Sequence, residues 1–191
     1  DKVGISRKKK DLAVIGLGYV GLPLAIEFGK KRSVIGFDVS KTRIDQLNNS
    51  QDINLEVSKK EFNQSSNLLI TNNIEKIKNC KIYIVTIPTP IDQNNKPDLT
   101  LLKSCCEMIG SFVKKDDLII FESTVYPGAT EEICAPIIAR RSGLKFNKDF
   151  YCGYSPERIN PGDKNHRISK IIKVTSGSTP KVANRVDELY K

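Results

Sequence analysis

The chain has 191 residues, with 31 Lys and Arg against 22 Asp and Glu, so its formal net charge is +9 when the single His is neutral. Hydrophobic residues make up 39% and charged residues 28%, ordinary proportions that exclude collagen-like, low-complexity and disordered classes. No apolar run approaches the roughly 20 residues that cross a bilayer. We therefore expect a globular protein of one or two domains with no membrane partner.

Much of the positive charge lies at the start of the chain. Residues 1–10 read DKVGISRKKK, five basic side chains against one aspartate. A basic arm of this kind can bind nucleic acid, but no aromatic platform or recognition motif accompanies it. We predict a solvated basic leader over residues 1–10, one domain over residues 11–191, and no nucleic-acid partner.

The five cysteines form an odd set without a CxxC pair or a histidine at zinc spacing, so neither a disulfide framework nor a metal site is indicated. They are Cys80, Cys105, Cys106, Cys134 and Cys152. Free, mostly buried thiols are the prediction, and such thiols are typical of the reducing cytoplasm.

Short β-rich runs alternate with amphipathic stretches, which is the pattern of parallel βαβ units. We predict strands at residues 12–15, 33–37, 68–71, 82–86, 118–122, 150–154 and 171–175. We predict helices at residues 20–30, 41–48, 99–113 and 129–141. Asp98 is placed to cap the third helix. Residues 48–67 predict a surface loop with a short helix, and Thr179 with Pro180 predicts the start of one more helix.

A glycine motif follows the first predicted strand at once. Gly16, Gly18 and Gly21 form GxGxxG: the first allows a tight turn, the second lets a pyrophosphate approach the backbone, and the third lets the helix pack on the strand. Asp38 ends the next strand, 22 residues after Gly16, near the spacing of a carboxylate that binds the adenosine ribose. A 2′-phosphate would meet its charge, so the sequence predicts NAD rather than NADP. A glycine turn in another α/β protein is the alternative.

Three further segments follow predicted parallel strands, at the sheet edge where open α/β folds bind ligands. They are IPTP at residues 87–90, STVYPG at residues 123–128 and YSPERINPGD at residues 154–163. Each could also be a plain turn. Glu157 beside Arg158 could be a solvated ion pair, or a base acting on substrate or water.

Together, GLGYVGLPLA, IPTP, ESTVYPGATEE and GYSPERINPGDKNHR resemble the UDP-glucose/GDP-mannose dehydrogenase family, in particular its branch that oxidises UDP-N-acetylhexosamines at C6. The motifs run in the family's order from about residue 12 to about residue 179. The resemblance implies an α/β fold of the Rossmann type, a doubly wound, mostly parallel sheet with helices on both faces. It also implies oxidation of a C6 alcohol to a carboxylate with two NAD, through a cysteine thioester.

The resemblance implies roles for individual residues. Glu157 would be the general base for thioester hydrolysis, and Thr124 would orient the reacting water. Pro161 stands where UDP-glucose enzymes often carry a glutamate, which favours an N-acetylhexosamine substrate. The implied NAD-binding residues are Gly16, Gly18, Tyr19, Val20, Gly21, Asp38, Arg43, Pro88, Thr89 and Thr124.

The family's nucleophilic Cys, with its assisting Lys and Asn, would lie after residue 191, so we expect this chain to bind NAD without turning over. Cys152 lacks the family's surrounding glycines, and His166 is interpreted as a polar loop residue. For the whole protein we expect a UDP-sugar substrate, a role in making surface polysaccharide precursors and a homo-oligomer. A self-contained dinucleotide-sensing module and a hydroxyacid-type dehydrogenase without a thiol intermediate are the alternatives.

Overall fold

A parallel sheet forms the centre of the chain. The computed structural model describes residues 11–54, 56–93, 95–122, 128–156 and 174–191. Within them the sheet has seven strands in the order β3-β2-β1-β4-β5-β6-β7, all parallel except β7, which pairs antiparallel with β6. The strands are β1 (Leu12–Ile15), β2 (Val34–Phe37), β3 (Leu68–Thr71), β4 (Ile82–Val85), β5 (Leu118–Phe121), β6 (Tyr151–Tyr154) and β7 (Ser176–Gly177).

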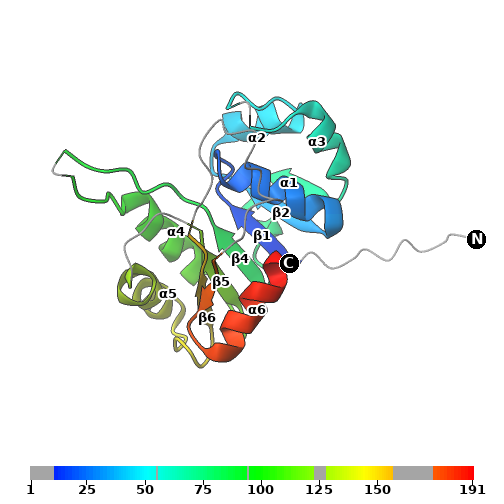
Figure 1. Cartoon of the computed structure of the whole chain (residues 1–191). Coiled ribbons are helices and arrows are strands. Elements are labelled where there is room, and N and C mark those ends of the chain that lie inside the picture. Colours follow the sequence, from blue (N-terminus) through cyan, green and yellow to red (C-terminus); the bar gives the residue numbers. More distant parts are fainter. Residues whose placement is uncertain (1–10, 55, 94, 123–127, 157–173) are drawn as a thin grey trace, which may run out of the picture.

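Helices cover both faces of this sheet (Figure 1). They are α1 (Gly21–Lys31), α2 (Lys41–Asn48), α3 (Lys59–Gln64), α4 (Thr100–Gly110), α5 (Ala135–Ser142) and α6 (Pro180–Tyr190). Alternate strand residues point to opposite faces, so the core is divided into two apolar clusters. Ala13 packs in the cluster beneath α4 and α5, and Val14 packs in the cluster beneath α1, α2 and α6. This arrangement confirms the predicted doubly wound α/β fold.

The ends of two predicted helices differ from the structure. The apolar pattern of residues 99–113 continues through Phe112 and Val113, which are buried, but the helix itself ends at Gly110. Predicted helix 129–141 begins with a π-helical turn, η2 (Thr130–Cys134), and becomes α-helical only at Ala135. Pro136 explains this change, because it lacks the N–H that a continuous α-helix would need at that point.

The strand predicted at residues 171–175 falls mostly outside the described residues. Val174 and Thr175, which are described, are not in a strand, and the edge strand β7 begins one residue later. Its short antiparallel pairing with β6 differs from the parallel pattern of the rest of the sheet.

Of the two predicted caps, Thr179 is the N-cap residue of its helix, whereas Asp98 lies one residue before the N-cap position, which Leu99 occupies. Thr179 Oγ1 accepts a hydrogen bond from the Val182 N–H, and Pro180 opens α6. Asp98 Oδ1 accepts from the Thr100 N–H at 2.9 Å, although Leu99 stands between it and the helix. Both side chains therefore supply an acceptor to an N–H group at the helix start that would otherwise lack one.

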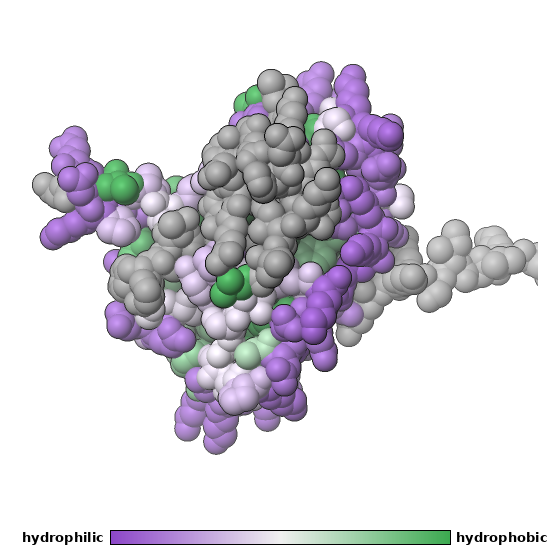
Figure 2. All heavy atoms as spheres, in the orientation of Figure 1, coloured by the Kyte–Doolittle hydropathy of each residue, from purple (hydrophilic) through white to green (hydrophobic). Residues whose placement is uncertain are grey.

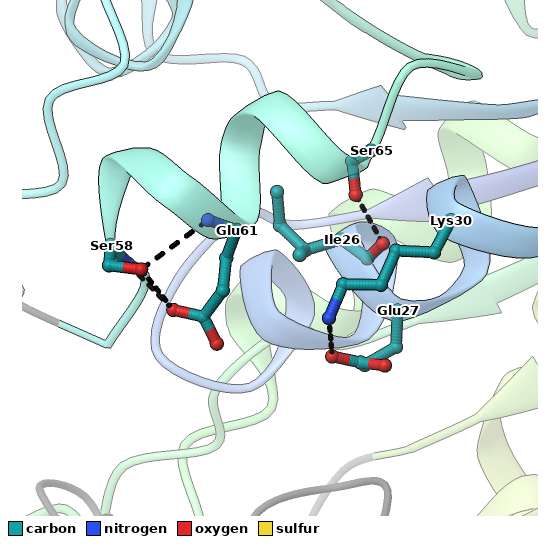
Figure 3. A network of polar contacts seen from close by, with 6 residues as sticks. All are labelled: Ile26, Glu27, Lys30, Ser58, Glu61 and Ser65. Carbon is teal, nitrogen blue, oxygen red and sulfur yellow. Dashed lines mark hydrogen bonds and ion pairs between the residues drawn. The ribbon is translucent and has the colours of Figure 1, made fainter.

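The short helix predicted within residues 48–67 is α3, and Figure 3 shows how it is held. Ser58 accepts from the Glu61 N–H while the Glu61 carboxylate accepts from the Ser58 N–H, which is a capping box. After the helix, the Ser65 hydroxyl donates to the Ile26 carbonyl oxygen of α1. The capping box closes the start of α3, and the Ser65 hydrogen bond ties the end of α3 to α1.

The distribution of hydrophilic residues and the burial of the cysteines both fit what the amino-acid composition predicts. Figure 2 shows hydrophilic residues around most of the periphery of this face, with hydrophobic residues in separate spots. All five cysteines are buried, as predicted, and none of them is in a disulfide. In the part of the chain that the structure describes, no helix is both long enough and apolar enough to cross a membrane.

One buried carboxyl group predicts a pH dependence of stability. Asp117 is fully buried, Oδ2 accepts from the Lys114 N–H, and Oδ1 lies 3.5 Å from Lys81 Nζ. Burial raises its pKa above the ordinary value despite these partners. The folded state therefore binds this proton more tightly than the unfolded state, so the group's contribution to stability falls as pH rises through its folded pKa.

We accordingly expect Asp117→Asn to raise the melting temperature relative to the unmodified chain at neutral pH, and this gain should shrink as the solution is acidified. Scanning calorimetry across pH measures it. The matched control is Asp116→Asn, which removes the same charge from an exposed neighbour and keeps a residue type that tolerates its φ of 69°. A gain that stays constant across pH, or appears equally in the control, would contradict the assignment.

Candidate functional site

The glycine motif forms a tightly packed turn in which only the position of Gly18 has open space beside it. Gly16 has a φ of +95°, and its N–H donates to the Phe37 carbonyl oxygen at 2.8 Å. A Cβ atom on Gly21 would lie 1.7 Å from the Gly16 carbonyl oxygen, so only glycine fits there. A Cβ atom on Gly18 would have nothing within 4 Å. This geometry matches the three roles predicted for the motif: turn, access and close packing.

The neighbouring strand β4 braces this turn through Thr86. The Thr86 hydroxyl lies 2.6 Å from the Gly16 carbonyl oxygen and 3.0 Å from that of Ile15. Sequence reasoning placed Thr86 only at the end of a strand. The sequence feature that could have indicated this role is the Thr86 hydroxyl at the carboxyl end of β4, because β4 lies beside β1, the strand that leads into the glycine motif.

Asp38 is held rigidly at the end of β2. Its Oδ2 accepts from the Leu17 N–H at 2.8 Å, and its Oδ1 accepts from the Ser40 N–H at 2.9 Å. Two backbone donors thus fix the plane of the carboxylate beside the glycine turn. Because a carboxylate offers about four acceptor positions, it can also accept from the hydroxyl groups of a ribose.

Arg43, on α2, supports the same turn from outside. Its Nε donates to the Leu17 carbonyl oxygen at 2.9 Å, and one terminal nitrogen lies 2.9 Å from Asp52 Oδ1. Asp52 is itself buried and accepts from the N–H groups of Asn54, Glu56 and Val57. The structure thus shows Arg43 joining the glycine turn to the loop after α2, and its contact with an adenosine ribose stays a prediction.

A cavity of about 740 Å³ opens along the carboxyl ends of β2, β1, β4 and β5, and we name it the cofactor cavity. Its lining residues are Ile15, Gly16, Gly18, Tyr19, Val20, Phe37, Asp38, Val39, Thr86, Ile87, Pro88, Thr89, Pro90, Leu101, Ser104, Cys105, Met108 and Glu122. Its size is that of a small-molecule or cofactor site.

The cofactor cavity brings together most of the predicted NAD-binding residues: Gly16, Gly18, Tyr19, Val20, Asp38, Pro88 and Thr89. Gly21 and Arg43 do not line it and support the turn instead. Thr124 and Glu157 lie outside the described residues, as do Pro161 and His166. Sequence reasoning missed Glu122, a buried carboxylate in the wall of the cavity.

Two buried cysteines, Cys105 in the wall of the cavity and Cys152 in β6, are expected to be poor nucleophiles. Burial raises the pKa of the Cys105 thiol to about 12, and it raises that of Cys152 well above the ordinary value. Since the thiolate is the reactive form, both groups are expected to remain protonated at neutral pH. Among the described residues, no group of three metal-ligating side chains comes together.

A glycine turn at a helix start, an acidic residue at the end of the second strand and a cavity across the central strand ends together define a dinucleotide-binding domain of the Rossmann type. The chain belongs to the UDP-glucose/GDP-mannose dehydrogenase family: the NAD-binding domain of that family matches residues 10–191. NAD is therefore its cofactor, and the open space at Gly18 and the fixed carboxylate of Asp38 fit it.

Characterised relatives share this similarity over nearly the whole chain. The chain is 58% identical over 184 residues to UDP-N-acetyl-D-glucosamine 6-dehydrogenase from Pseudomonas aeruginosa, covering 95% of the chain and 44% of the relative. It is 57% identical over 180 residues to the enzyme of that name from Salmonella typhi, covering 94% of the chain and 42% of the relative. The chain thus spans less than half the length of these relatives.

Solved structures show the same fold. UDP-D-ManNAc dehydrogenase from Pyrococcus horikoshii superposes with a TM-score of 0.82 at 31% identity, over 94% of this chain and 44% of that one. The expectations of a Rossmann-type fold, of this family and of NAD are confirmed.

Proposed function

We propose that this chain is the NAD-binding domain of an enzyme that oxidises a UDP-N-acetylhexosamine at C6 to the corresponding uronic acid. The observation that carries the proposal is the 58% identity, over 95% of this chain, to a UDP-N-acetyl-D-glucosamine 6-dehydrogenase. The product class fits a role in making precursors of surface polysaccharides.

In this proposal the chain's own residues bind and orient NAD. N–H groups at the start of α1, beside the open Gly18, bind the pyrophosphate, and Asp38 accepts from the adenosine ribose. Tyr19, Val20, Pro88 and Thr89 line the same cavity and shape the space around the dinucleotide. When bound, NAD supplies the oxidising group, and the walls of the cavity determine where that group lies.

The later steps depend on groups whose geometry the structure does not describe. We assign Glu157 as the base that activates water against a thioester, with Thr124 orienting that water. The thiol that forms the thioester would come from a part of the enzyme outside this chain. We also propose that the whole enzyme is a cytoplasmic homo-oligomer and that the domain alone is inactive.

The experiment is to purify the full-length protein and incubate it with UDP-N-acetylglucosamine or UDP-N-acetylgalactosamine and NAD. We expect two NADH for each sugar converted, since the alcohol is oxidised by four electrons to a carboxylate. UDP-glucose is the control substrate and should react much more slowly. One NADH per sugar, with a carbonyl product, would instead indicate a hydroxyacid-type dehydrogenase. Binding of NAD without any turnover of these sugars would favour a dinucleotide sensor.

A further inference from the structure

A buried acidic side chain lies in the cofactor cavity on the far side from Asp38. Glu122 follows the last residue of β5, and its N–H donates to the Val85 carbonyl oxygen at 2.8 Å. It is 1% exposed and still lines the cavity. Burying a carboxylate is costly unless hydrogen-bond donors surround it.

The helix α6 supplies one donor. The Tyr190 hydroxyl donates to Glu122 Oε2 at 2.7 Å, and the Tyr190 ring packs against Phe28 of α1 with ring centroids 5.9 Å apart. Burial raises the pKa of Tyr190, so it remains a phenol that can donate. The carboxylate is therefore held in place from the side of α6, and the Tyr190 hydroxyl bonds at one of the about four acceptor positions that a carboxylate has.

The topology of the sheet pairs Glu122 with Asp38. In the order β3-β2-β1-β4-β5-β6, β2 and β5 occupy equivalent places in the two halves of the sheet. Asp38 is the first residue after β2 and Glu122 the first after β5, and a phenylalanine precedes each of them. Both line the same cavity. Each half of the sheet thus contributes one acidic residue to the cavity, Asp38 from the side of β2 and Glu122 from the side of β5.

We propose that Glu122 is a second acidic contact for the dinucleotide, which accepts a hydrogen bond from its nicotinamide half as Asp38 does from its adenosine half. This inference rests on the proposed placement of NAD in the cofactor cavity. The nicotinamide half offers matching donors, namely the carboxamide N–H groups and the ribose hydroxyls. The oxidised nicotinamide ring is also positively charged, so a carboxylate nearby favours NAD⁺ over NADH.

The test is calorimetric titration of the chain and its Glu122→Gln variant with NAD⁺, NADH and ADP. Glutamine keeps the shape and can still accept from Tyr190. We expect NAD⁺ binding to weaken about tenfold, the scale of one hydrogen bond to a charged group. NADH should weaken less, because its ring is neutral, and ADP should bind unchanged, because it lacks the nicotinamide half.

A second variant guards against a folding artefact. Tyr190→Phe keeps the ring beside Phe28 and removes only the hydroxyl that holds Glu122. This variant should weaken NAD⁺ binding by less than Glu122→Gln does, and it should leave the affinity for ADP unchanged. Undiminished NAD⁺ binding by Glu122→Gln, or an equal loss for ADP and NAD⁺, would overturn the inference. If the unmodified chain bound neither NAD⁺ nor ADP, that result would contradict the placement of NAD in the cavity.

Discussion

Replacement of Gly18 by valine should abolish measurable NAD binding while the fold survives. A Cβ atom at Gly18 meets nothing within 4 Å, and the backbone there lies outside the left-handed region, so a side chain can leave the backbone there without strain. Its branched side chain instead fills the space where the pyrophosphate approaches. Loss of two phosphate hydrogen bonds, each about 1.5–3 kcal/mol, weakens binding at least about a hundredfold.

Calorimetry with NAD and a thermal melt measure the two effects of Gly18→Val separately. Gly18→Ala should give a smaller loss of affinity at the same melting temperature. Gly21→Ala is the contrasting control, because its Cβ atom would lie 1.7 Å from the Gly16 carbonyl oxygen and should lower the melting temperature. Full NAD affinity in Gly18→Val would show that the dinucleotide lies elsewhere.

Replacement of Asp38 by alanine should remove the preference for NAD over NADP. The carboxylate accepts from the ribose hydroxyls of NAD and repels a 2′-phosphate, so its loss should weaken NAD about tenfold or more while NADP binds no more weakly than before. The two affinities should therefore converge. Parallel titrations of both dinucleotides measure the ratio.

Two variants separate charge from structure in this test. Asp38→Ala leaves both the Leu17 and the Ser40 N–H groups without their acceptor, whereas Asp38→Asn removes the charge and keeps an acceptor oxygen for one of the two. Asp45→Ala removes an exposed carboxylate from α2, outside the cavity, and should leave the ratio unchanged. An unmodified chain that bound both dinucleotides equally would show that Asp38 does not discriminate between them.

The sequence predicted the six parallel strands and the glycine turn because their signals are local. Short apolar runs bounded by polar residues or glycine mark each of these strands, and the stretch from Gly16 to Asp38 contains α1 and β2. Helix ends were less predictable. Phe112 stays buried beyond the end of α4, so the apolar pattern continued where the helix had stopped.

The contacts that complete the site could not be predicted, because they join residues far apart in the chain. Thr86 reaches the carbonyl oxygen of Gly16 across 70 positions, and Tyr190 reaches Glu122 across 68. No spacing rule covers such distances. They follow from the strand order, which places β1 beside β4 and the end of α6 beside the end of β5.

The central claim is that NAD lies across the carboxyl ends of β2, β1, β4 and β5. Amide chemical shifts of the isotope-labelled chain, recorded by NMR during an NAD titration, test it most directly. We predict the largest shifts at Gly18, Asp38, Thr89 and Glu122. Asp117 should change little, because it lies at the amino end of β5, on the opposite edge of the sheet from the cavity. Shifts centred on that opposite edge, or none at saturating NAD, would contradict the account.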